Sequence, residues 1–493
     1  MIKNNNTYIA VSILCCVYIF LTILCINNCY FWDVIQLVSN EAHWFYNTGF
    51  TSLLIPYGNE YNIVATGYHF PLIGIITAAL WKMVGYELYV SHLFTLLWAF
   101  LLIYNSWKLV SRLFLKKDVN WVLLILLLNP IIVTQIAISS PDVILITSMV
   151  IALRAIFENK PVMLAVSLFF ICGTSMRGVF VGCLLFASHL FYDYSKHENK
   201  SVLTSFRNII LPYLPILLLL LIYYTYYLIM QGWFFSEDSP FAEIGKQPTS
   251  VQGIFKQLLA YGLRSVETGQ IFIWGFAIYF IFRFIKMSKN QRRTFWSKET
   301  GEINMLCVYF FLLFGMYLIL SCISRMALGT RYLMPQFFVL TLLVLHFSVK
   351  SFKATSLKII FPVILILMQT GHFWIYPEKI AKSWDCTLAH LPYYELREKC
   401  FHYMKEENID CEDVSAGFSI CGNISRIELN KLNKRIYSDG YMDKCNYFIY
   451  SNISNLTDET IDELKNSDKW LPIQSFSKWP VFMTIYKKNE AYN

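Results

Sequence analysis

Long apolar runs separated by short polar segments follow one another along the chain down to about residue 375. An α-helix needs roughly 20 predominantly apolar residues to cross a bilayer, so these runs predict about eleven membrane-spanning helices. The predicted spans are residues 8–27, 88–110, 120–137, 143–158, 161–175, 178–192, 208–230, 269–286, 304–322, 332–348 and 358–375. No small-residue cleavage site clearly follows the first run, so we expect it to be retained as a helix. The pattern indicates an α-helical polytopic membrane protein.

Two further segments have the pattern of helices that lie along a membrane surface. Residues 71–85 are apolar but short for a span. Residues 250–265 have one apolar side, with Lys256 and Arg264 placed elsewhere around the helix. Helices of this kind could form the wall of a lipid-accessible cavity.

After residue 375 the pattern changes to that of a small soluble α/β domain, residues 376–493. Short alternating segments predict strands, and helical spacing predicts two helices, the second of which begins with Thr457 as its N-cap. The predicted strands are residues 413–420, 434–439, 446–452 and 481–488, and the predicted helices are residues 393–408 and 457–466. Five of the 13 cysteines lie here, either in a disulfide or as free buried thiols.

The composition agrees with a membrane protein, because 56% of the residues are hydrophobic and 17% are aromatic. The formal net charge of +8 comes from Lys and Arg residues that gather in alternate loops. Cytoplasmic loops carry such an excess, whereas residues 27–69 contain no Lys or Arg. The positive charge therefore indicates topology, with a cytoplasmic N-terminus and an extracytoplasmic C-terminal domain, and not binding to nucleic acid.

Several acidic and imidazole side chains lie near the expected extracytoplasmic ends of the helices. Asp33 and Glu41 follow the first span at a spacing of eight residues, close to one face of a continuous helix. Carboxylates against apolar walls can act as a general base or hold a metal ion, but these two could also be ordinary solvated loop residues. Asp142 lies at a turn between two spans and could simply cap the next helix. His69 precedes the apolar segment 71–85. At a helix start it could bind an anion, transfer a proton or simply cap the helix.

Four arginines fall at or near the same helix ends, where the positive-inside bias disfavours them. They are Arg177, Arg264, Arg325 and Arg331. The planar guanidinium suits bidentate recognition of phosphate, and buried cations near a membrane usually have partners. The arginines therefore indicate either an anionic ligand or structural ion pairs with Asp33, Glu41 or Asp142. Both hold if the ion pairs open when the ligand binds.

The order of these elements carries a family resemblance. An acidic residue follows the first span, and then come a His-x-Pro-Leu element, a Pro-Asp turn, a Thr-x-x-Arg-Gly turn and a late Arg-Tyr-Leu-x-Pro. This order resembles the GT-C superfamily, in particular the protein O-mannosyltransferases and lipid A aminoarabinose transferases. The resemblance covers roughly residues 8–348 and does not extend to the C-terminal domain.

The resemblance implies a glycosyltransferase that moves a hexosyl or pentosyl group from a polyprenyl-phosphate donor to a lipid, glycan or protein acceptor. The reaction would take place among membrane lipids on the extracytoplasmic face. Attack opposite the phosphate would invert the anomeric carbon, and short loops with few processing signals favour a bacterial inner membrane. A lipid-linked phosphate is already an activated leaving group, which agrees with the lack of a convincing nucleotide-binding motif in the sequence.

The resemblance also implies roles for individual residues. Asp33 matches the first-loop acidic residue that activates the acceptor or binds a metal, and Asp142 matches the acidic residue between the third and fourth spans. Glu41 is a further catalytic candidate, although it does not directly follow Asp33 as the second acid does in the O-mannosyltransferases. His69, Arg177, Arg331 and Tyr332 match family positions and are candidates for contact with the donor phosphate. Arg264 is a further candidate because of its place near an extracytoplasmic helix end. Phe70 and Leu72 depart from the Lys or Pro that family members often have. No diagnostic ligand spacing settles whether a divalent metal ion takes part.

Two other classes of protein have many helices and charges within the membrane. A transporter or lipid-linked glycan flippase would more often show broken mid-membrane helices or two similar halves, and neither is evident in the sequence. A polysaccharide polymerase or ligase also uses lipid-linked donors but has a large late external loop, whereas the acidic loop here is early. Glycosyl transfer is favoured, with both classes kept as alternatives.

Overall fold

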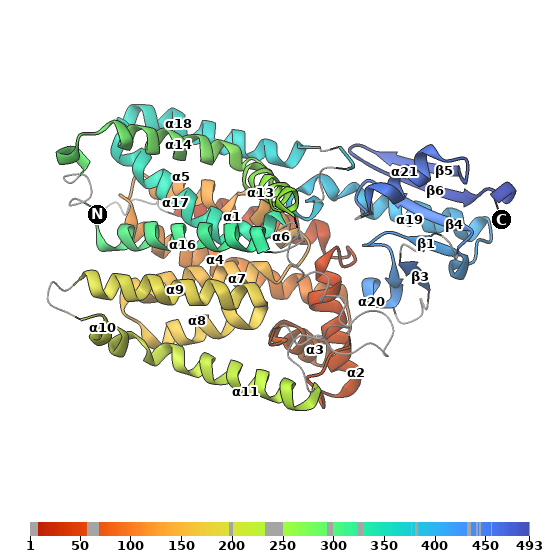
Figure 1. Ribbon diagram of the computed structural model, residues 1–493, viewed down its shortest axis with the longest axis horizontal. Helices are drawn as coiled ribbons and strands as arrows, with labels where there is room; N and C mark the ends of the chain where they lie inside the picture. Colours follow the sequence, from red (N-terminus) through yellow and green to blue (C-terminus); the bar gives the residue numbers. More distant parts are fainter. Residues whose placement is uncertain are drawn as a thin grey trace.

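The fold is described from a computed structural model. It describes residues 8–56, 69–196, 201–231, 250–292, 299–323, 329–375, 377–379, 383–430, 435–439, 442, 445–454 and 456–492. A bundle of helices forms the first part of the chain, and a small mixed sheet with its own helices lies at one end of that bundle (Figure 1).

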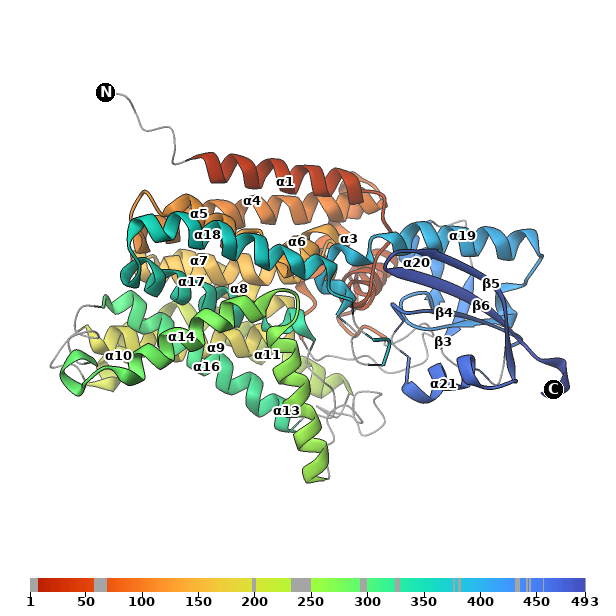
Figure 2. The same ribbon diagram turned by 90° about the horizontal axis from the view of Figure 1, so that it is seen from above.

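Most helices of the bundle run side by side along the long axis of the molecule (Figures 1 and 2). Each predicted span coincides largely with one helix or, for residues 120–137, with two. These helices are α1 (Ile9–Cys25), α4 (Leu88–Leu113), α5 (Val119–Leu127), α6 (Pro130–Ala137), α7 (Asp142–Glu158), α8 (Pro161–Thr174), α9 (Met176–Ser195), α11 (Leu214–Gln231), α14 (Gln270–Lys286), α16 (Gly301–Ile323), α17 (Met334–Ser351) and α18 (Ala354–Gln369). The prediction of an α-helical polytopic fold is confirmed.

Several of these helices can cross a membrane. By length and apolar composition, five helices of the described chain qualify, or seven if each of two bent pairs is one span. Large apolar side chains such as Phe20, Leu97 and Leu221 are exposed on the outside of the bundle, as on a lipid-facing surface. The chain is therefore a multi-pass membrane protein, and the count of about eleven spans stays a prediction.

Two helix pairs bend where the sequence stops one helix and begins another. α5 and α6 meet at 57°. Pro130 begins α6 without a backbone N–H, and the Asn129 side chain accepts a hydrogen bond from the Ile131 amide at 3.1 Å. α13 (Val251–Val266) and α14 meet at 97°. Gly269 between them has a φ of 83°, a left-handed conformation that favours glycine.

α13 leaves the bundle at this corner and projects from it (Figure 2). α13 coincides with the amphipathic segment that the sequence predicts to lie along the membrane surface. The Ser250 side chain caps the helix by accepting a hydrogen bond from the Gly253 amide. The second predicted surface segment is α3 (Leu72–Val84), which ends at Gly85. Both helices exist as expected, and their location at a membrane surface stays a prediction.

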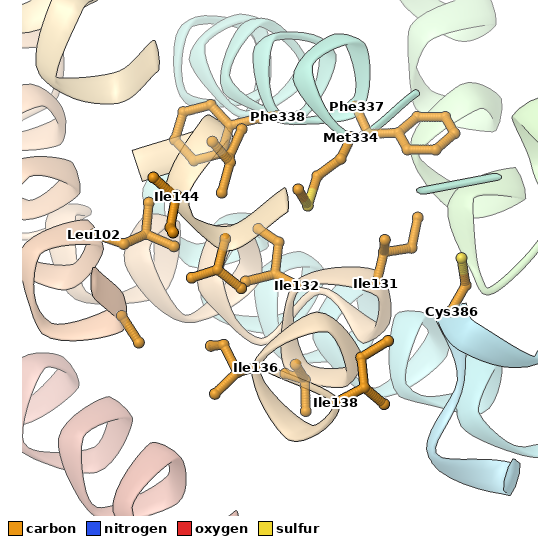
Figure 3. Packing of buried hydrophobic residues seen from close by; sticks show 14 of the residues in the cluster. Leu102, Ile131, Ile132, Ile136, Ile138, Ile144, Met334, Phe337, Phe338 and Cys386 are labelled. Atoms are coloured by element: carbon orange, nitrogen blue, oxygen red, sulfur yellow. The ribbon is translucent and has the colours of Figure 1, made fainter. Parts of the chain in front are cut away.

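The core of the bundle surrounds α6, all of whose residues are buried. Ile131 and Ile132 of α6 lie near Met334 at the start of α17 (Figure 3). α7 and α17 are buried on almost every face because other helices surround them. Cys386, which lies beyond the last bundle helix, belongs to the same buried cluster (Figure 3). The C-terminal region therefore shares the core of the bundle.

The C-terminal region contains a six-stranded mixed sheet in the order β2-β3-β1-β4-β6-β5. β1 runs parallel to β3 and β4, whereas β6 is antiparallel to both β4 and β5. The elements are α19 (Pro392–Glu406), β1 (Val414–Ala416), β2 (Gly422–Asn423), α20 (Ile424–Glu428), β3 (Ile436–Asp439), β4 (Tyr447–Ser451), α21 (Asp458–Asn466), β5 (Trp470–Lys478) and β6 (Val481–Lys488). Thr457 caps α21 as predicted. Cys386 and Cys400 are free buried thiols, and the domain boundary at residue 376 stays a prediction.

Candidate active site

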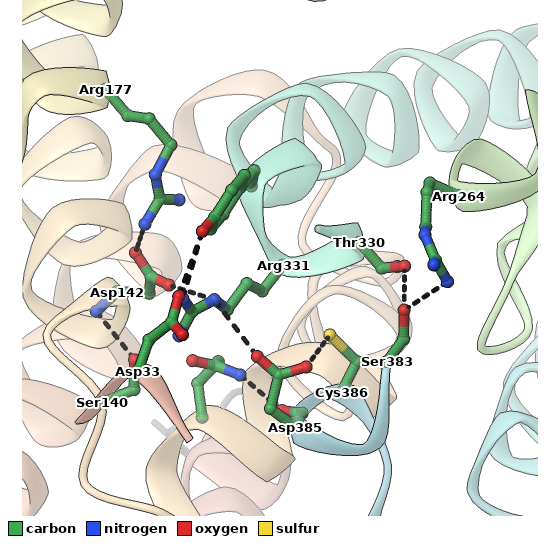
Figure 4. Close-up of polar contacts among 12 residues, drawn as sticks. Asp33, Ser140, Asp142, Arg177, Arg264, Thr330, Arg331, Ser383, Asp385 and Cys386 are labelled. Atoms are coloured by element: carbon green, nitrogen blue, oxygen red, sulfur yellow. Dashed lines mark hydrogen bonds and ion pairs between the residues drawn. The ribbon is translucent and has the colours of Figure 1, made fainter. Parts of the chain in front are cut away.

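Four segments far apart in the sequence meet where the helix bundle joins the C-terminal region (Figure 4). They are the turn before the π-helix η2 (Ile35–Asn40), the start of α7, η4 (Thr330–Leu333) at the start of α17, and η6 (Trp384–Cys386). They bring together Asp33, Asp142, Arg331 and Asp385. The first three are among the residues predicted from the sequence, and Asp385 is not.

Arg331 lies at the centre of this group. Its side chain is 2% exposed, and its Nη2 contacts Asp33 Oδ2. Its Nε lies 3.2 Å from Asp385 Oδ2 and 3.6 Å from Asp142 Oδ2. Burying a charge is costly unless it has partners. The three carboxylates therefore offset the cost of burying this guanidinium.

Asp33 is the carboxylate of the three that a ligand can reach. Its side chain is 34% exposed, whereas those of Asp142 and Asp385 are almost wholly buried. Besides the contact with Arg331, the Tyr332 hydroxyl donates a hydrogen bond to Asp33 Oδ2 at 3.1 Å. Asp33 therefore presents a carboxylate to the outside while two neighbours fix it from the inside.

Arg177 adds a second cation to the group. Its Nη2 lies 2.8 Å from Asp142 Oδ1, and its guanidinium lies over the Tyr332 ring at 3.9 Å from the ring centroid. The Ser175 side chain begins α9 by accepting a hydrogen bond from the Gly178 amide, which places Arg177 in the first turn of that helix. The Arg177 side chain remains partly exposed, so it can contact an anion that enters the site.

Strained backbone lies beside two of the carboxylates. Trp32, immediately before Asp33, has a φ of 51°, and Ser139, close before Asp142, has a φ of 56°. Such conformations cost non-glycine residues about 1 to 3 kcal/mol each and are concentrated at functional sites. Ser140 Oγ accepts a hydrogen bond from the Asp142 amide at 3.2 Å, which fixes the start of α7. The strain supports a functional role for this group.

A second buried network adjoins the first (Figure 4). Arg264 Nη1 lies 2.6 Å from Glu267 Oε1 and donates a hydrogen bond to Ser383 Oγ at 2.8 Å. The Thr330 hydroxyl donates to Glu267 Oε2 at 2.5 Å. Thr330 is the chain neighbour of Arg331, so the two networks are joined through η4. The structure thus places Arg264 near the site but gives it a glutamate partner of its own.

Glu41 and His69 form a separate pair, with Glu41 Oε1 3.0 Å from His69 Nε2. The sequence predicts a shared helix face for Asp33 and Glu41, but the two carboxylates have different partners because a π-helix changes the helical repeat between them. Glu41 packs so closely against α3 that a Cβ on Gly74 would lie 2.4 Å from the Glu41 Cβ. Arg325, another predicted cation, lies outside the described residues.

Asp385 is the site residue that the sequence analysis missed. Burial raises its pKa to about 6, while Arg331 opposes this shift and Asp33 adds to it. The sequence contains one local indication that Asp385 is buried: its neighbours Trp384 and Cys386 are of residue types that are commonly buried. A carboxylate in such a setting needs a partner in the interior, which here is Arg331.

The carboxylates of the site also bear on metal binding. Among the residues that the structure describes, no group of three or more His, Cys, Asp or Glu side chains could hold a metal ion. Asp33, Asp142 and Asp385 do converge, but each directs an oxygen at the guanidinium of Arg331, which lies among them. In this arrangement the positive charge of Arg331 offsets the negative charge of the carboxylates.

No model of a known protein family matches the chain, and no curated protein matches its sequence. Its structure is similar to crystal structures of ArnT from Cupriavidus metallidurans, a lipid A aminoarabinose transferase with a GT-C fold. The apo structure matches with a TM-score of 0.51 and 11% identity over 96% of this chain and 97% of that chain. The structure bound to undecaprenyl phosphate matches with a TM-score of 0.47 and 10% identity over the same shares. At this identity, the apo structure establishes the fold alone.

Proposed function

We propose that this chain, which has the GT-C fold, is an integral-membrane glycosyltransferase. It moves a hexosyl or pentosyl group from a polyprenyl-phosphate donor to a lipid, glycan or protein acceptor. The observation that carries the proposal is the pairing of the partly exposed Asp33 carboxylate with the buried Arg331 guanidinium at one end of the bundle (Figure 4). This reaction needs a base that is open to an acceptor, and positive charge nearby that stabilises the departing phosphate.

Asp33 acts as the general base in the proposed reaction. Its carboxylate takes the proton of an acceptor hydroxyl or amine while the acceptor atom bonds to the anomeric carbon of the donor sugar. The bond between that carbon and the phosphate oxygen breaks, and polyprenyl phosphate leaves with the electron pair. Attack opposite the phosphate inverts the anomeric configuration. Arg331 and the Tyr332 hydroxyl orient the carboxylate for this step.

Arg177 is the side chain best placed to meet the departing phosphate. It is partly exposed and sits on the face of Tyr332. Arg331 is almost wholly buried, so it contributes positive charge at the site without being open to the donor. Arg264 and His69 are each paired with a glutamate, so phosphate contact from either requires that pair to open.

The charge distribution supports a location for the reaction. The loop that carries Asp33 has no Lys or Arg, whereas the basic residues gather in alternate loops. We therefore propose that the site lies on the extracytoplasmic face, with the N-terminus in the cytoplasm. The short loops favour a bacterial inner membrane. The C-terminal region, which contributes Asp385 to the site, would lie on the same face.

The test uses full-length protein in proteoliposomes with a panel of undecaprenyl-phosphoryl hexoses and pentoses, the matching undecaprenyl-diphosphate-linked donors, and a membrane lipid extract as acceptor. Undecaprenyl phosphate, the ligand in one ArnT structure, is the carrier chosen as the probe. We expect free undecaprenyl phosphate to be released from at least one donor. Release from diphosphate-linked donors alone would indicate a polymerase or ligase. Movement of intact donor across the bilayer without release would indicate a flippase, and either result would contradict the proposal.

A further inference from the structure

The C-terminal region supplies a side chain to the candidate active site. Asp385 Oδ2 lies 3.2 Å from Nε of Arg331. Two contacts hold Asp385 in place: Gln135 of α6 donates a hydrogen bond to its backbone carbonyl at 2.6 Å, and the Cys386 thiol donates to Oδ1 at 3.4 Å. Asp385 is thus fixed at its backbone and at one oxygen, and its other oxygen is directed at Arg331 (Figure 4).

Arg331 connects Asp385 to Asp33. A guanidinium is planar and rigid, so a contact at Nε sets the direction in which Nη2 points. Nη2 is the atom that contacts Asp33 Oδ2. The Arg331 side chain is 2% exposed, so solvent cannot replace a partner that is removed. The orientation of the Asp33 carboxylate therefore depends on what holds the far side of the guanidinium.

We propose that Asp385 is a positioning residue for Asp33: it holds Nε of Arg331 and thereby sets the orientation in which Arg331 meets the Asp33 carboxylate. This inference rests on the proposed function, in which Asp33 is the general base. Asp385 is too buried to meet a substrate, so it acts through Arg331.

The same C-terminal region also holds the backbone on both sides of Asp33. The Tyr30 amide donates a hydrogen bond to the Ile427 carbonyl at 3.0 Å, and Ser39 Oγ donates to the Arg426 carbonyl at 2.6 Å. Both acceptors belong to α20. The backbone of Asp33 and its counter-ion are therefore positioned by one part of the molecule.

The protonation of Asp385 makes this role dependent on pH. Burial raises the pKa of Asp385 to about 6, and the titratable or charged groups that face it are Arg331, Asp33, Cys386 and Asp142. Below this pH the carboxyl group is protonated and uncharged, so the ion pair between Asp385 Oδ2 and Arg331 Nε is lost. We therefore expect turnover to rise as the pH passes upward through about 6.

Two variants and a control test the inference. Asp385→Ala, Asp385→Asn and Asp468→Ala, an exposed aspartate of the same region, are assayed for release of undecaprenyl phosphate from about pH 5 to about pH 8. Asp385→Ala should lower kcat by about tenfold or more with little change in KM, because orientation is lost and donor binding is not. Asp385→Asn keeps a polar oxygen beside Nε but has no proton to lose, so it should retain more activity than Asp385→Ala and lack the rise near pH 6. Wild-type kcat and pH profile in Asp385→Ala would overturn the inference.

Infrared titration separates this inference from the proposed function because it needs no substrate. The wild type should show a carboxyl group that loses its proton near pH 6, and Asp385→Asn should lack it. Asp385→Ala should also shift the carboxylate band of Asp33, which is assigned with Asp33→Asn. A shifted band in a protein that turns over no donor would support the contact and refute the proposed function. An unshifted band would overturn the inference whatever the activity.

Discussion

At the scale of single residues, one buried arginine organises the candidate active site. The sequence predicts Asp33, Asp142 and Arg331 as candidates because charged residues beside apolar helix ends need a structural or functional reason. It cannot predict that they meet, since Arg331 and Asp33 lie 298 positions apart. Asp385 escapes prediction because it falls in a segment with the composition of a soluble domain, where most carboxylates are exposed.

Arg331→Met should destabilise the protein, because it removes the charge and keeps an apolar side chain of similar length. Asp385 is almost wholly buried and would lose its cation, whereas Asp142 would keep its ion pair with Arg177. Leaving one buried charge unpaired should lower the free energy of unfolding by about 3 to 5 kcal/mol. Unfolding in detergent measures this, with the exposed Arg207→Met as the matched control. Equal stability of the two variants would contradict the role of Arg331 as the shared counter-ion.

At the scale of elements, local pattern predicts the helices better than their bends or the sheet. Apolar runs and caps are local signals, so most helices coincide with their predicted ranges. The strand β5 is not predicted, because Pro472 lies within it and the register shifts between Pro472 and Gln474. The corner at Gly269 is not predicted either, since it depends on close packing against α18 from a distant part of the chain.

Gly269→Ala tests this corner. A Cβ at Gly269 would lie 2.4 Å from the Met368 carbonyl oxygen, and the φ of 83° is unfavourable for alanine. The substitution should cost about 1 to 3 kcal/mol or more in unfolding free energy. Gly275→Ala in the adjacent helix, where a Cβ would meet no atom within 4 Å, should instead be neutral or stabilising by up to about 1 kcal/mol. If the two variants unfold alike, the corner is not tightly packed.

At the scale of the whole molecule, the C-terminal region completes the candidate active site. Phe31, two residues before Asp33, is fully buried and stacks on His390 with ring centroids 4.6 Å apart. Composition predicts a change from apolar helices to a mixed α/β region after residue 375, and a sheet does follow α18. It does not predict which surface of that fold meets the bundle, because the contact joins side chains from distant segments such as Phe31 and Tyr393.

Phe31→Ala should loosen this contact. The ring contacts both His390 and Tyr393 and no part of it is exposed, so truncation should cost about 3 to 5 kcal/mol of unfolding free energy. It should also reduce turnover, since Asp33 lies on the same loop. Phe20→Ala removes an outward-facing ring from α1 and serves as the control for unfolding and turnover in detergent. If Phe31→Ala is as stable and active as Phe20→Ala, the contact of Phe31 with the C-terminal region supports neither stability nor turnover.

The central claim is that Asp33 is the base in sugar transfer from a polyprenyl-phosphate donor. The most direct measurement is release of undecaprenyl phosphate from a labelled donor by wild type, Asp33→Asn and Asp33→Ala in nanodiscs, with Asp468→Ala as the control. Both Asp33 variants should lower kcat by about 100-fold or more, because neither side chain can take the acceptor proton. Release at the wild-type rate in both Asp33 variants would contradict the claim.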